Sequence, residues 1–266
     1  QRNPKLIAWT ADNKSPYGAL DVATVTTLDF NCSKPPFDDP DIRWAINHCI
    51  NRDQIVQIGS HGIGGKTLLP FPRSGALQPY YDGVNDLFQK YPIDSFDLTK
   101  TAQLLQGKGY AKDSGGFWAK GGQRFSFVLT LPPPFFTDIG PVIVEQLRKG
   151  GFDVSFKSPA NASTLISQGD VDAFLDVPGG SVRDPYVTLS FLLSRFSAPT
   201  GQPATRPYRW KNDNYDKIVE QLGKTQPTDP SFMTMYHQAM ELWIPNLPMI
   251  PLINRYIYIT PNTTYW

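Results

Sequence analysis

A regular alternation of strand and helix patterns between residues 124 and 177 limits the possible folds more than any other feature of the sequence. Apolar and β-branched runs alternate there with helical patterns. The expected order is strand, helix, strand, helix, strand, at residues 124–131, 138–149, 151–158, 161–168 and 171–177. Strands separated by helices form βαβ units, whose strands lie parallel in one sheet. The sequence therefore predicts an α/β fold with a mixed, partly parallel sheet flanked by helices.

Two further elements are expected before this region. The stretch VTTLDFN (25–31) alternates between apolar and polar residues and predicts a strand. A helix from about residue 40 to residue 58 should follow, with one apolar face and with Asp38 or Asp39 as its N-cap.

The remaining patterns are mainly helical. Asp97 is expected to cap a helix that ends at Gly107 or Gly109, since glycine commonly ends helices. Near the end of the chain the sequence predicts two more helices and a closing strand, at 213–223, 230–244 and 249–259.

The composition bears on the class of partner. The chain has 266 residues, with 25 basic and 24 acidic side chains and a net charge of +1. This balance does not favour nucleic acid or a membrane surface as a partner. The sequence starts at Gln1 without a signal peptide and stops directly after a strand pattern, so we expect a piece of a longer mature protein. The two cysteines, Cys32 and Cys49, could pair or stay free.

No motif of the sequence calls for catalysis. The stretch SHGIGGKT (60–67) is similar to a phosphate-binding loop, but Ser60 replaces the first glycine, and Pro70 and Pro72 prevent the helix that would hold phosphate. The histidines show no metal-ligand spacing (His48, His61, His237). We therefore expect no catalytic residue, metal or cofactor. A hydrolase or transferase with scattered catalytic residues is the alternative.

The stretch FN-x-x-KPPFDDPDIRWAIN-x-x-INRDQIV (30–56) resembles the signature of family 5 extracytoplasmic solute-binding proteins. These are the peptide, nickel, opine and oligosaccharide receptors of ABC importers. The matching positions are Asn31, Pro36 to Asp39, Arg43, Ala45, Ile46, Arg52 and Asp53, and the order Asn51-Arg52-Asp53 departs slightly from the usual Asp-Arg. Five further stretches follow in the order of the family, at 97–110, 140–157, 169–177, 212–222 and 236–252. We interpret Arg43 and Trp44 as structural residues.

The resemblance implies a binding protein, not an enzyme, with two lobes that enclose a ligand. It also implies that this chain is the second lobe. Residues 1–28 would be the end of the first lobe and a hinge strand, 29–248 the second ligand-binding lobe, and 249–266 the hinge strand that returns to the first lobe. The missing first lobe would come from the same protein or from a companion chain, and an ABC permease would be the partner. A periplasmic or extracellular location is expected, and a membrane anchor would lie in the absent N-terminal part.

The cleft residues of this lobe are expected in two places, the loop PGGSVRDP (178–185) and the closing strand. Gly179 and Gly180 either let the backbone approach a ligand or merely form a turn. Peptide-binding members resemble one another in placing an aspartate in this loop for the ligand's ammonium group. Ungapped counting puts the neutral Ser181 there, although Asp176 or Asp184 could serve in a shifted register. The expected ligand-binding residues are Gly179, Gly180, Ser181, Arg183, Trp210, Asn254 and Arg255.

Two features favour a sugar ligand. The chain has six tryptophans, whose flat rings pack on pyranose faces, and Trp210 is the best surface candidate, whereas Trp44 and Trp243 are expected in the core. The terminal stretch ITPNTTYW (259–266) resembles the tail of the oligosaccharide-type members. We therefore expect an oligosaccharide or a similar polar solute, with an oligopeptide as the alternative.

Overall fold

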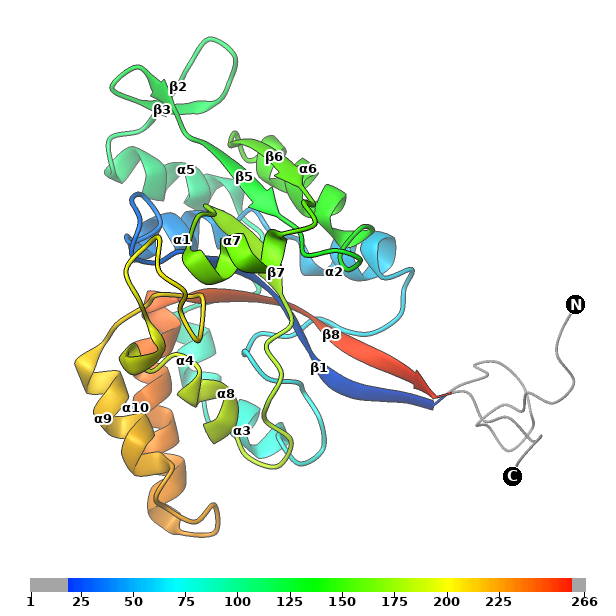
Figure 1. Ribbon diagram of the computed structural model, residues 1–266, viewed down its shortest axis with the longest axis vertical. Helices are drawn as coiled ribbons and strands as arrows, with labels where there is room; N and C mark the ends of the chain where they lie inside the picture. The colour runs from blue at the N-terminus through cyan, green and yellow to red at the C-terminus, as the bar shows by residue number, and fades with distance from the viewer. Residues whose placement is uncertain (1–18, 260–266) are drawn as a thin grey trace, which may run out of the picture.

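A five-stranded sheet runs through the centre of the protein (Figure 1). The computed structural model describes residues 19–259, and side chains from residue 24 to residue 255. In spatial order the sheet contains β6 (Asp153–Lys157), β5 (Ser126–Thr130), β7 (Ala173–Asp176), β1 (Ala19–Phe30) and β8 (Met249–Ile259). β5 is parallel to both β6 and β7, whereas β1 is antiparallel to β7 and β8. The predicted mixed, partly parallel sheet is therefore confirmed.

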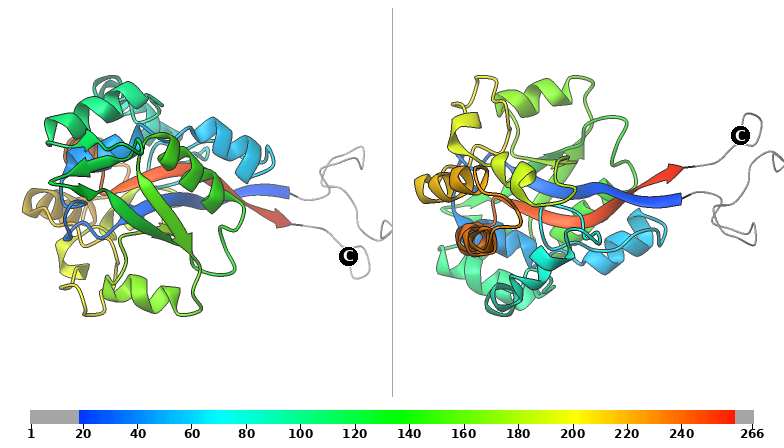
Figure 2. Two further views of the ribbon diagram at one scale, coloured as in Figure 1. Left: turned by 90° about the horizontal axis from the view of Figure 1, so that it is seen from above. Right: turned by 90° about the horizontal axis from the view of Figure 1, so that it is seen from below.

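β1 and β8 form a long two-stranded ribbon that leaves the body of the protein (Figures 1 and 2). They pair from Ala19 opposite Ile259 to Asp29 opposite Met249, whereas β7 pairs with β1 only from Thr27 onward. Parts of the expected hinge segments 1–28 and 249–266, together with Trp9, Trp266 and most of ITPNTTYW, lie outside the described residues.

The expected single helix 40–58 is wrong, because the chain breaks it between His48 and Asn51. The observed segments are α1 (Pro40–Asn47), α2 (Arg52–Gln54) and a π-helical turn η1 (Ile55–Gly59). Asn51 is extended, and its side chain accepts a hydrogen bond from the Gln54 amide at 3.0 Å, so it caps a new helix. The cap of α1 is Asp39, which accepts from the Asp41 amide at 2.9 Å, as predicted.

The other expected helices are present within one or two residues of their predicted bounds. They are α5 (Leu98–Gly107), α6 (Ile139–Lys149), α7 (Ala162–Gln168), α9 (Asp213–Leu222) and α10 (Pro230–Asn246). The sequence reading missed shorter elements, namely α3 (Gln78–Asp82), α4 (Asn85–Lys90), α8 (Tyr186–Ser190), a 3₁₀ turn η2 (Ser194–Phe196), and a small sheet of β2 (Ala111–Lys112), β3 (Trp118–Lys120) and β4 (Gln123–Arg124). Within residues 19–259, no helix combines the length and apolar character needed to cross a membrane.

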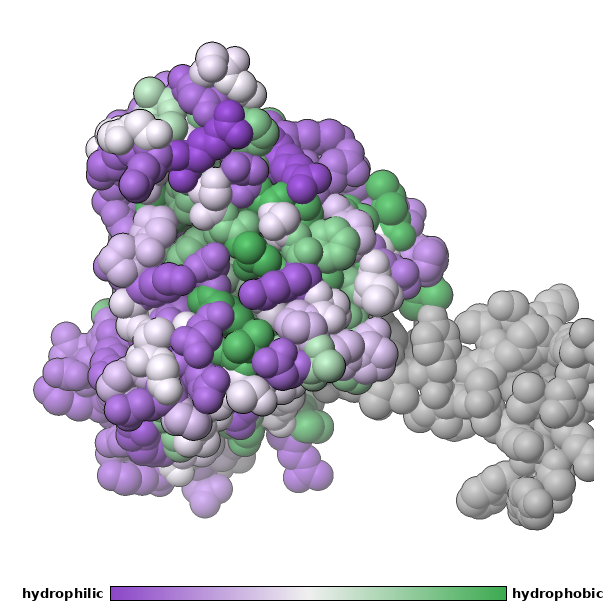
Figure 3. Space-filling model, turned by 45° about the horizontal axis from the view of Figure 1, so that its top comes forward, coloured by the Kyte–Doolittle hydropathy of each residue, from purple (hydrophilic) through white to green (hydrophobic). Residues whose placement is uncertain are grey.

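The core holds aromatic rings and both cysteines. The four tryptophans with described side chains, at positions 44, 118, 210 and 243, are all buried. Cys32 and Cys49 are buried free thiols and do not form a disulfide bond with each other. Burial raises the pKa of the Cys32 thiol to about 11 and that of the Cys49 thiol to about 12. Outside the core, apolar side chains gather in the middle of the face shown in Figure 3, bordered by polar residues.

Arg43 joins the start of α1 to the end of α10. Its side chain is 1% exposed, and it donates to Phe37 O and Asn246 O and to Leu247 O at 3.1 Å. Helix ends leave carbonyls without partners inside the helix, and a cation there also offsets the partial negative charge. The neighbouring Trp44 donates its indole N–H to Pro245 O at 3.0 Å. Both residues are structural, as predicted.

Arg52 makes a second connection of the same kind, and it is 2% exposed. Its guanidinium donates to Pro251 O in β8 at 2.8 Å, to Ile93 O at 2.8 Å and to Asn47 Oδ1 at 2.7 Å. Burial lowers the pKa of Arg52 to about 10, so the group stays charged at neutral pH. The two arginines of the 30–56 stretch thus hold the C-terminus of α10 and the first part of β8.

We expect Arg43→Lys to lower the free energy of unfolding by about 2–4 kcal/mol, because one ammonium group cannot reach all three carbonyls and leaves buried acceptors unpaired. Urea unfolding followed by circular dichroism measures the change. Arg195→Lys is the matched control, because Arg195 is exposed and pairs with the exposed Glu220, and its effect should stay within about 0.5 kcal/mol. Equal unfolding midpoints for Arg43→Lys and wild type would contradict the assigned role.

Candidate functional site

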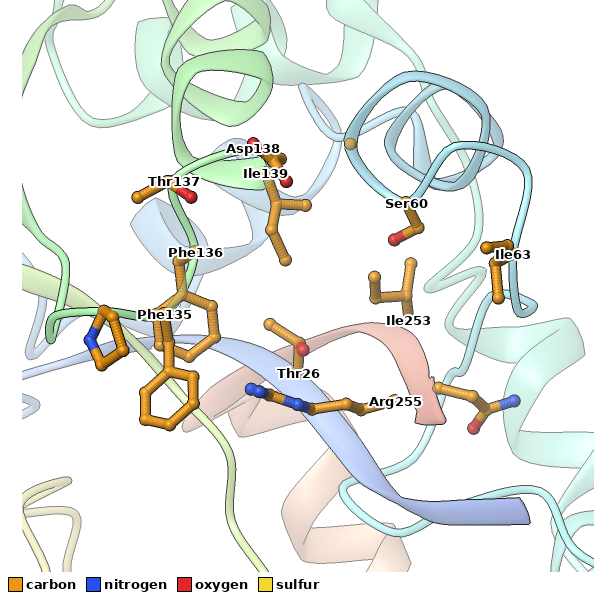
Figure 4. A pocket seen from close by; sticks show the side chains of 13 residues that line it. Thr26, Ser60, Ile63, Phe135, Phe136, Thr137, Asp138, Ile139, Ile253 and Arg255 are labelled. Atoms are coloured by element: carbon orange, nitrogen blue, oxygen red, sulfur yellow. The ribbon is translucent and has the colours of Figure 1, made fainter. Parts of the chain in front are cut away.

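A cavity of about 370 Å³ opens between the first turn of α6, the chain after η1 and the strands β1 and β8 (Figure 4). Its floor is the β1–β8 pair, where Thr26 lies opposite Ile253. Its other lining residues are Gly59, Ser60, Ile63, Pro134, Phe135, Phe136, Thr137, Asp138, Ile139, Asn254 and Arg255. We refer to this as the first cavity.

A second cavity, of about 460 Å³, lies next to the first. It is lined by Pro132, Phe135, Phe136, Ser163, Ile166, Ser167, Phe174, Asp176, Val177, Ala204, Thr205, Pro207 and Arg255. Three of these residues, Phe135, Phe136 and Arg255, line both cavities. The two cavities therefore share a wall, and a ligand longer than either cavity could lie across both.

The shared wall comes from the loop between β5 and α6. Phe136 has a φ of 69°, a left-handed conformation that is uncommon for a bulky residue, and such strain is concentrated at functional sites. The rings of these two adjacent residues differ in exposure. Phe136 is buried, whereas Phe135 is 47% exposed. An exposed ring at a cavity mouth provides an apolar surface for a ligand.

Asn254 and Arg255, which the sequence analysis expects to bind ligand, both line the first cavity. Asn254 is buried, its backbone N–H donates to Gly65 O at 2.8 Å, and its side-chain oxygen accepts from the Arg73 amide at 3.3 Å. Asn254 thus fastens the 59–75 loop to β8. Arg255 extends from β8 with its guanidinium carbon 4.7 Å from the centroid of the Phe135 ring, and Figure 4 shows it pointing along the cavity floor.

The loop 178–185 contributes no residue to either cavity. Ser181 is buried, its amide donates to Thr188 Oγ1, and its hydroxyl oxygen accepts from the Thr188 amide, both at 3.1 Å. Gly180 has a φ of 135° and packs closely on the Val187 side chain, which fits the turn interpretation. The four loop candidates Gly179, Gly180, Ser181 and Arg183 therefore lie apart from both cavities.

Trp210 is not a surface residue, and this expectation is wrong. It is 7% exposed, and its ring packs edge-on against Tyr215 with the centroids 4.9 Å apart. The prolines and polar residues around it in the sequence, which suggested exposure, belong to a loop that covers the core.

The sequence reading missed the aromatic pair Phe135 and Phe136, which forms the wall of both cavities. The signal was the run PPPFF (132–136) between an expected strand and an expected helix. Prolines fix φ and stiffen such a connection, and ligand pockets are lined mainly by hydrophobic and aromatic side chains.

The stretch 60–67 does not bind phosphate in the manner of a phosphate-binding loop. Lys66 pairs with Asp94 at 2.7 Å and with Asp53 at 3.2 Å, and the next helix, α3, begins only at Gln78. For the residues with described side chains, no three histidine, cysteine or acidic residues lie close enough together to hold a metal ion.

A buried carboxyl group lies behind the second cavity. Asp29 is fully buried. Its Oδ2 accepts from Thr27 Oγ1 at 2.7 Å, and no group of the described residues forms a hydrogen bond with its Oδ1. The cavity-lining Asp176 accepts from the Tyr208 hydroxyl at 2.9 Å. Burial, and then the charge of Asp176, raise the pKa of Asp29 well above its ordinary value. The Asp29 carboxyl group therefore keeps its proton at pH values where an exposed aspartate is ionised.

This pKa shift makes stability depend on pH, because between the unfolded and folded pKa values of Asp29 the folded state binds more protons than the unfolded state. Stability should fall as the pH rises from about 4 to the folded pKa, by about 1.4 kcal/mol per pH unit from this group. We expect Asp29→Asn to remove the part of this stability loss that comes from Asp29. The urea concentration at the unfolding midpoint, measured from pH 4 to pH 8, reports the change. The exposed Asp170→Asn is the control, and parallel pH curves for Asp29→Asn and wild type would contradict the shift.

Comparisons with known proteins place these features in a family. A model of the family described as bacterial extracellular solute-binding proteins, family 5 Middle, matches residues 9–239. Heme-binding protein A of Haemophilus influenzae is 25% identical over 233 residues, which cover 86% of this chain and 39% of that protein. The dipeptide-binding protein of Escherichia coli is 33% identical over 100 residues, which cover 36% of this chain and 17% of that protein.

Solved structures have the same fold. A periplasmic oligopeptide-binding protein of an ABC transporter from Thermotoga maritima has a TM-score of 0.79 at 20% identity, covering 97% of this chain and 48% of that protein. NikZ from Campylobacter jejuni, in complex with Ni(L-His), has a TM-score of 0.76 at 20% identity, covering 91% of this chain and 47% of that protein. The fold is thus that of periplasmic binding proteins, and the chain spans about half the length of these structures. Because the family model matches most of the chain, the chain belongs to the bacterial extracellular solute-binding proteins of family 5.

Proposed function

We propose that this chain is the second lobe of a solute-binding protein that captures its ligand between two lobes and delivers it to an ABC importer. One observation carries the proposal, which is the pair of cavities that meet at Phe135, Phe136 and Arg255. Ligand sites commonly lie at domain interfaces and combine apolar walls with a few placed polar groups. These cavities have that character, with phenylalanine rings beside Thr26 and Arg255.

The division of the chain is part of the proposal. Residues 1–28 and 249–266 would hold the two strands that connect the lobes, and residues 29–248 would form the second lobe. The shape of the β1–β8 ribbon supports this, because its outer part, from Ala19 to Val22 in β1 and from Tyr256 to Ile259 in β8, has no third strand beside it in the described residues. Two strands that extend from a lobe without a third strand beside them can bend, and are therefore suited to act as a hinge.

The mechanism follows from this arrangement. A ligand that contacts both lobes stabilises the closed state relative to the open state, and the permease would recognise the closed state. The first lobe would belong to the same protein or to a companion chain, and the protein would act in the periplasm or outside the cell. The chain would bind without turnover.

The ligand we propose first is an oligopeptide or a similar charged solute. Charged groups of both signs line the cavities, with Arg255 in both, Asp138 in the first and Asp176 in the second. A peptide has groups that complement both charges. The E. coli relative is a dipeptide-binding protein, and one structural neighbour, AppA of Bacillus subtilis, holds a nonapeptide.

An oligosaccharide is the second candidate. The exposed ring of Phe135 could pack on a sugar face, and one neighbouring structure from Thermotoga maritima holds mannohexaose. The tryptophans do not add to this case, because the four with described side chains are buried.

Thermal unfolding of the full-length polypeptide that contains this sequence tests the proposal. We expect the melting temperature to rise with ligand concentration for one class in a panel of peptides and oligosaccharides, since ligand at about 100 times its Kd stabilises the folded state by about 2.7 kcal/mol. Bovine albumin is the control for unspecific effects.

Each outcome of this panel has a meaning. Stabilisation by sugars alone would overturn the peptide preference, and turnover of any stabilising compound would overturn the binding role. Lack of stabilisation by both classes would contradict the proposed ligands altogether.

A further inference from the structure

Arg255 lies between the two cavities, and its charge has no acidic partner among the described side chains. It is half-buried in β8, and it lines both cavities. No carboxylate with a described side chain comes within 4.0 Å of its guanidinium, and no described residue accepts a hydrogen bond from its side chain. By contrast, Arg195, a surface arginine of the same lobe, pairs with Glu220 at 2.7 Å.

A ring contact orients the guanidinium group of Arg255 and uses none of its hydrogen-bond donors. The guanidinium carbon lies 4.7 Å from the centroid of the Phe135 ring, a cation–π contact. Stacking uses the face of the guanidinium group and leaves the N–H groups at its edge available. An arginine oriented by a ring loses less rotamer freedom when a planar anion binds, so it is prepared for two parallel hydrogen bonds.

The acids around Arg255 restrict which anion could bind. Asp138 lines the first cavity and lies 3.8 Å from His61, whereas Asp176 lines the second and accepts hydrogen bonds from Tyr208 and from the Val177 amide. Neither acid has a carboxylate oxygen within 4.0 Å of the Arg255 guanidinium nitrogens. One cation with an acid on each side favours a single negative charge and disfavours a doubly charged phosphate, because like charges repel across a shared cavity.

We propose that Arg255 binds a carboxylate group of the ligand and so selects acidic or C-terminally free ligands over neutral ones. The inference rests on the proposed solute-binding function and adds to it a specificity-determining residue and a chemical class of ligand. The carboxylate lies edge-on against the guanidinium, and the adjoining part of the ligand lies on the exposed face of Phe135. The rest of the ligand extends into the first or the second cavity.

The alternative is that Arg255 pairs with a carboxylate of the first lobe and not with the ligand. Pairs of ligands that differ only in one carboxylate distinguish these two possibilities. The probes are tri-alanine with its C-terminal amide, and a trisaccharide that contains a single galacturonate residue with its methyl ester. The members of each pair differ in charge but little in shape. A guanidinium paired with the protein itself would not distinguish between them.

Isothermal titration calorimetry on the full-length polypeptide measures the four affinities for wild type, Arg255→Gln and Arg255→Lys. We expect wild type to bind the carboxylate member of one pair about tenfold more tightly or better than its neutral twin, because charge-assisted hydrogen bonds are stronger than neutral ones. Arg255→Gln should bind the two members equally. Arg255→Lys should keep part of the preference, since lysine retains the charge but not the fork.

Arg195→Gln is the matched control, because its guanidinium also lies over a phenylalanine ring, 4.9 Å from the centroid of Phe196, but lines neither cavity. It should keep the full wild-type preference. Equal binding of the twins by wild type, or a preference that survives in Arg255→Gln, would overturn the role of Arg255 and leave the solute-binding function intact. Lack of binding of all four probes would contradict the proposed ligand classes, and with them this inference.

Discussion

Two buried arginines hold the C-terminal strand of the lobe, and the position of the cavities depends on them. Arg43 fastens the end of α10 through the carbonyls of Asn246 and Leu247, and Arg52 fastens β8 through the carbonyl of Pro251. Arginine suits this task because it stays charged when buried and has five donors in a fixed geometry. Removing a guanidinium from water is costly, and three well-placed carbonyls compensate for that cost. Arg255 lies only four residues beyond Pro251, so the clamp that fixes β8 also fixes the cation of the site.

The backbone at the end of α10 shows why the clamp is needed. Leu247 is in the left-handed region with a φ of 41°, which costs a non-glycine residue roughly 1–2 kcal/mol. That turn allows the chain to pass from α10 into β8 within two residues. The donors of Arg43 bind the carbonyls on both sides of the turn, at Asn246 and Leu247, and so favour this conformation over the ordinary ones. The stretch that carries the family resemblance is therefore structural, and its conspicuous residues support β8.

The sequence allowed the regular part of the fold to be predicted, because caps and periodicity are local signals. Asp39 and Asp97 start α1 and α5 as expected. The apolar periodicity continued past His48, so it gave no sign of the break, which depends on the contact of Asn47 with Ile93 and on the cap of Asn51. Short helices such as α3 and α8 contain too few residues for a period to be visible. Asn254 and Arg255 were expected at the site because the resemblance makes the closing strand part of the cleft, and both line the first cavity. The loop at 178–185 was expected at the cleft from the family resemblance and from its place after a strand. Trp210 was judged by local composition, which does not report burial.

The cavities themselves could not be predicted, because they need three segments that are far apart in the sequence. Phe135 comes from the loop after β5, Ile63 from the chain after η1, and Arg255 from β8. Of these three segments only β8 is a regular secondary-structure element. Phe136, in the loop after β5, has a strained backbone, so the site uses a conformation that local propensities disfavour. If β1 and β8 are the hinge that we propose, Arg255 lies where the ribbon leaves the lobe, opposite Thr24. A bend of the ribbon at that point would move Arg255 relative to Phe135. The contact between them would then link occupation of the cavities to the angle between the lobes, because a ligand that binds both residues favours a single ribbon geometry.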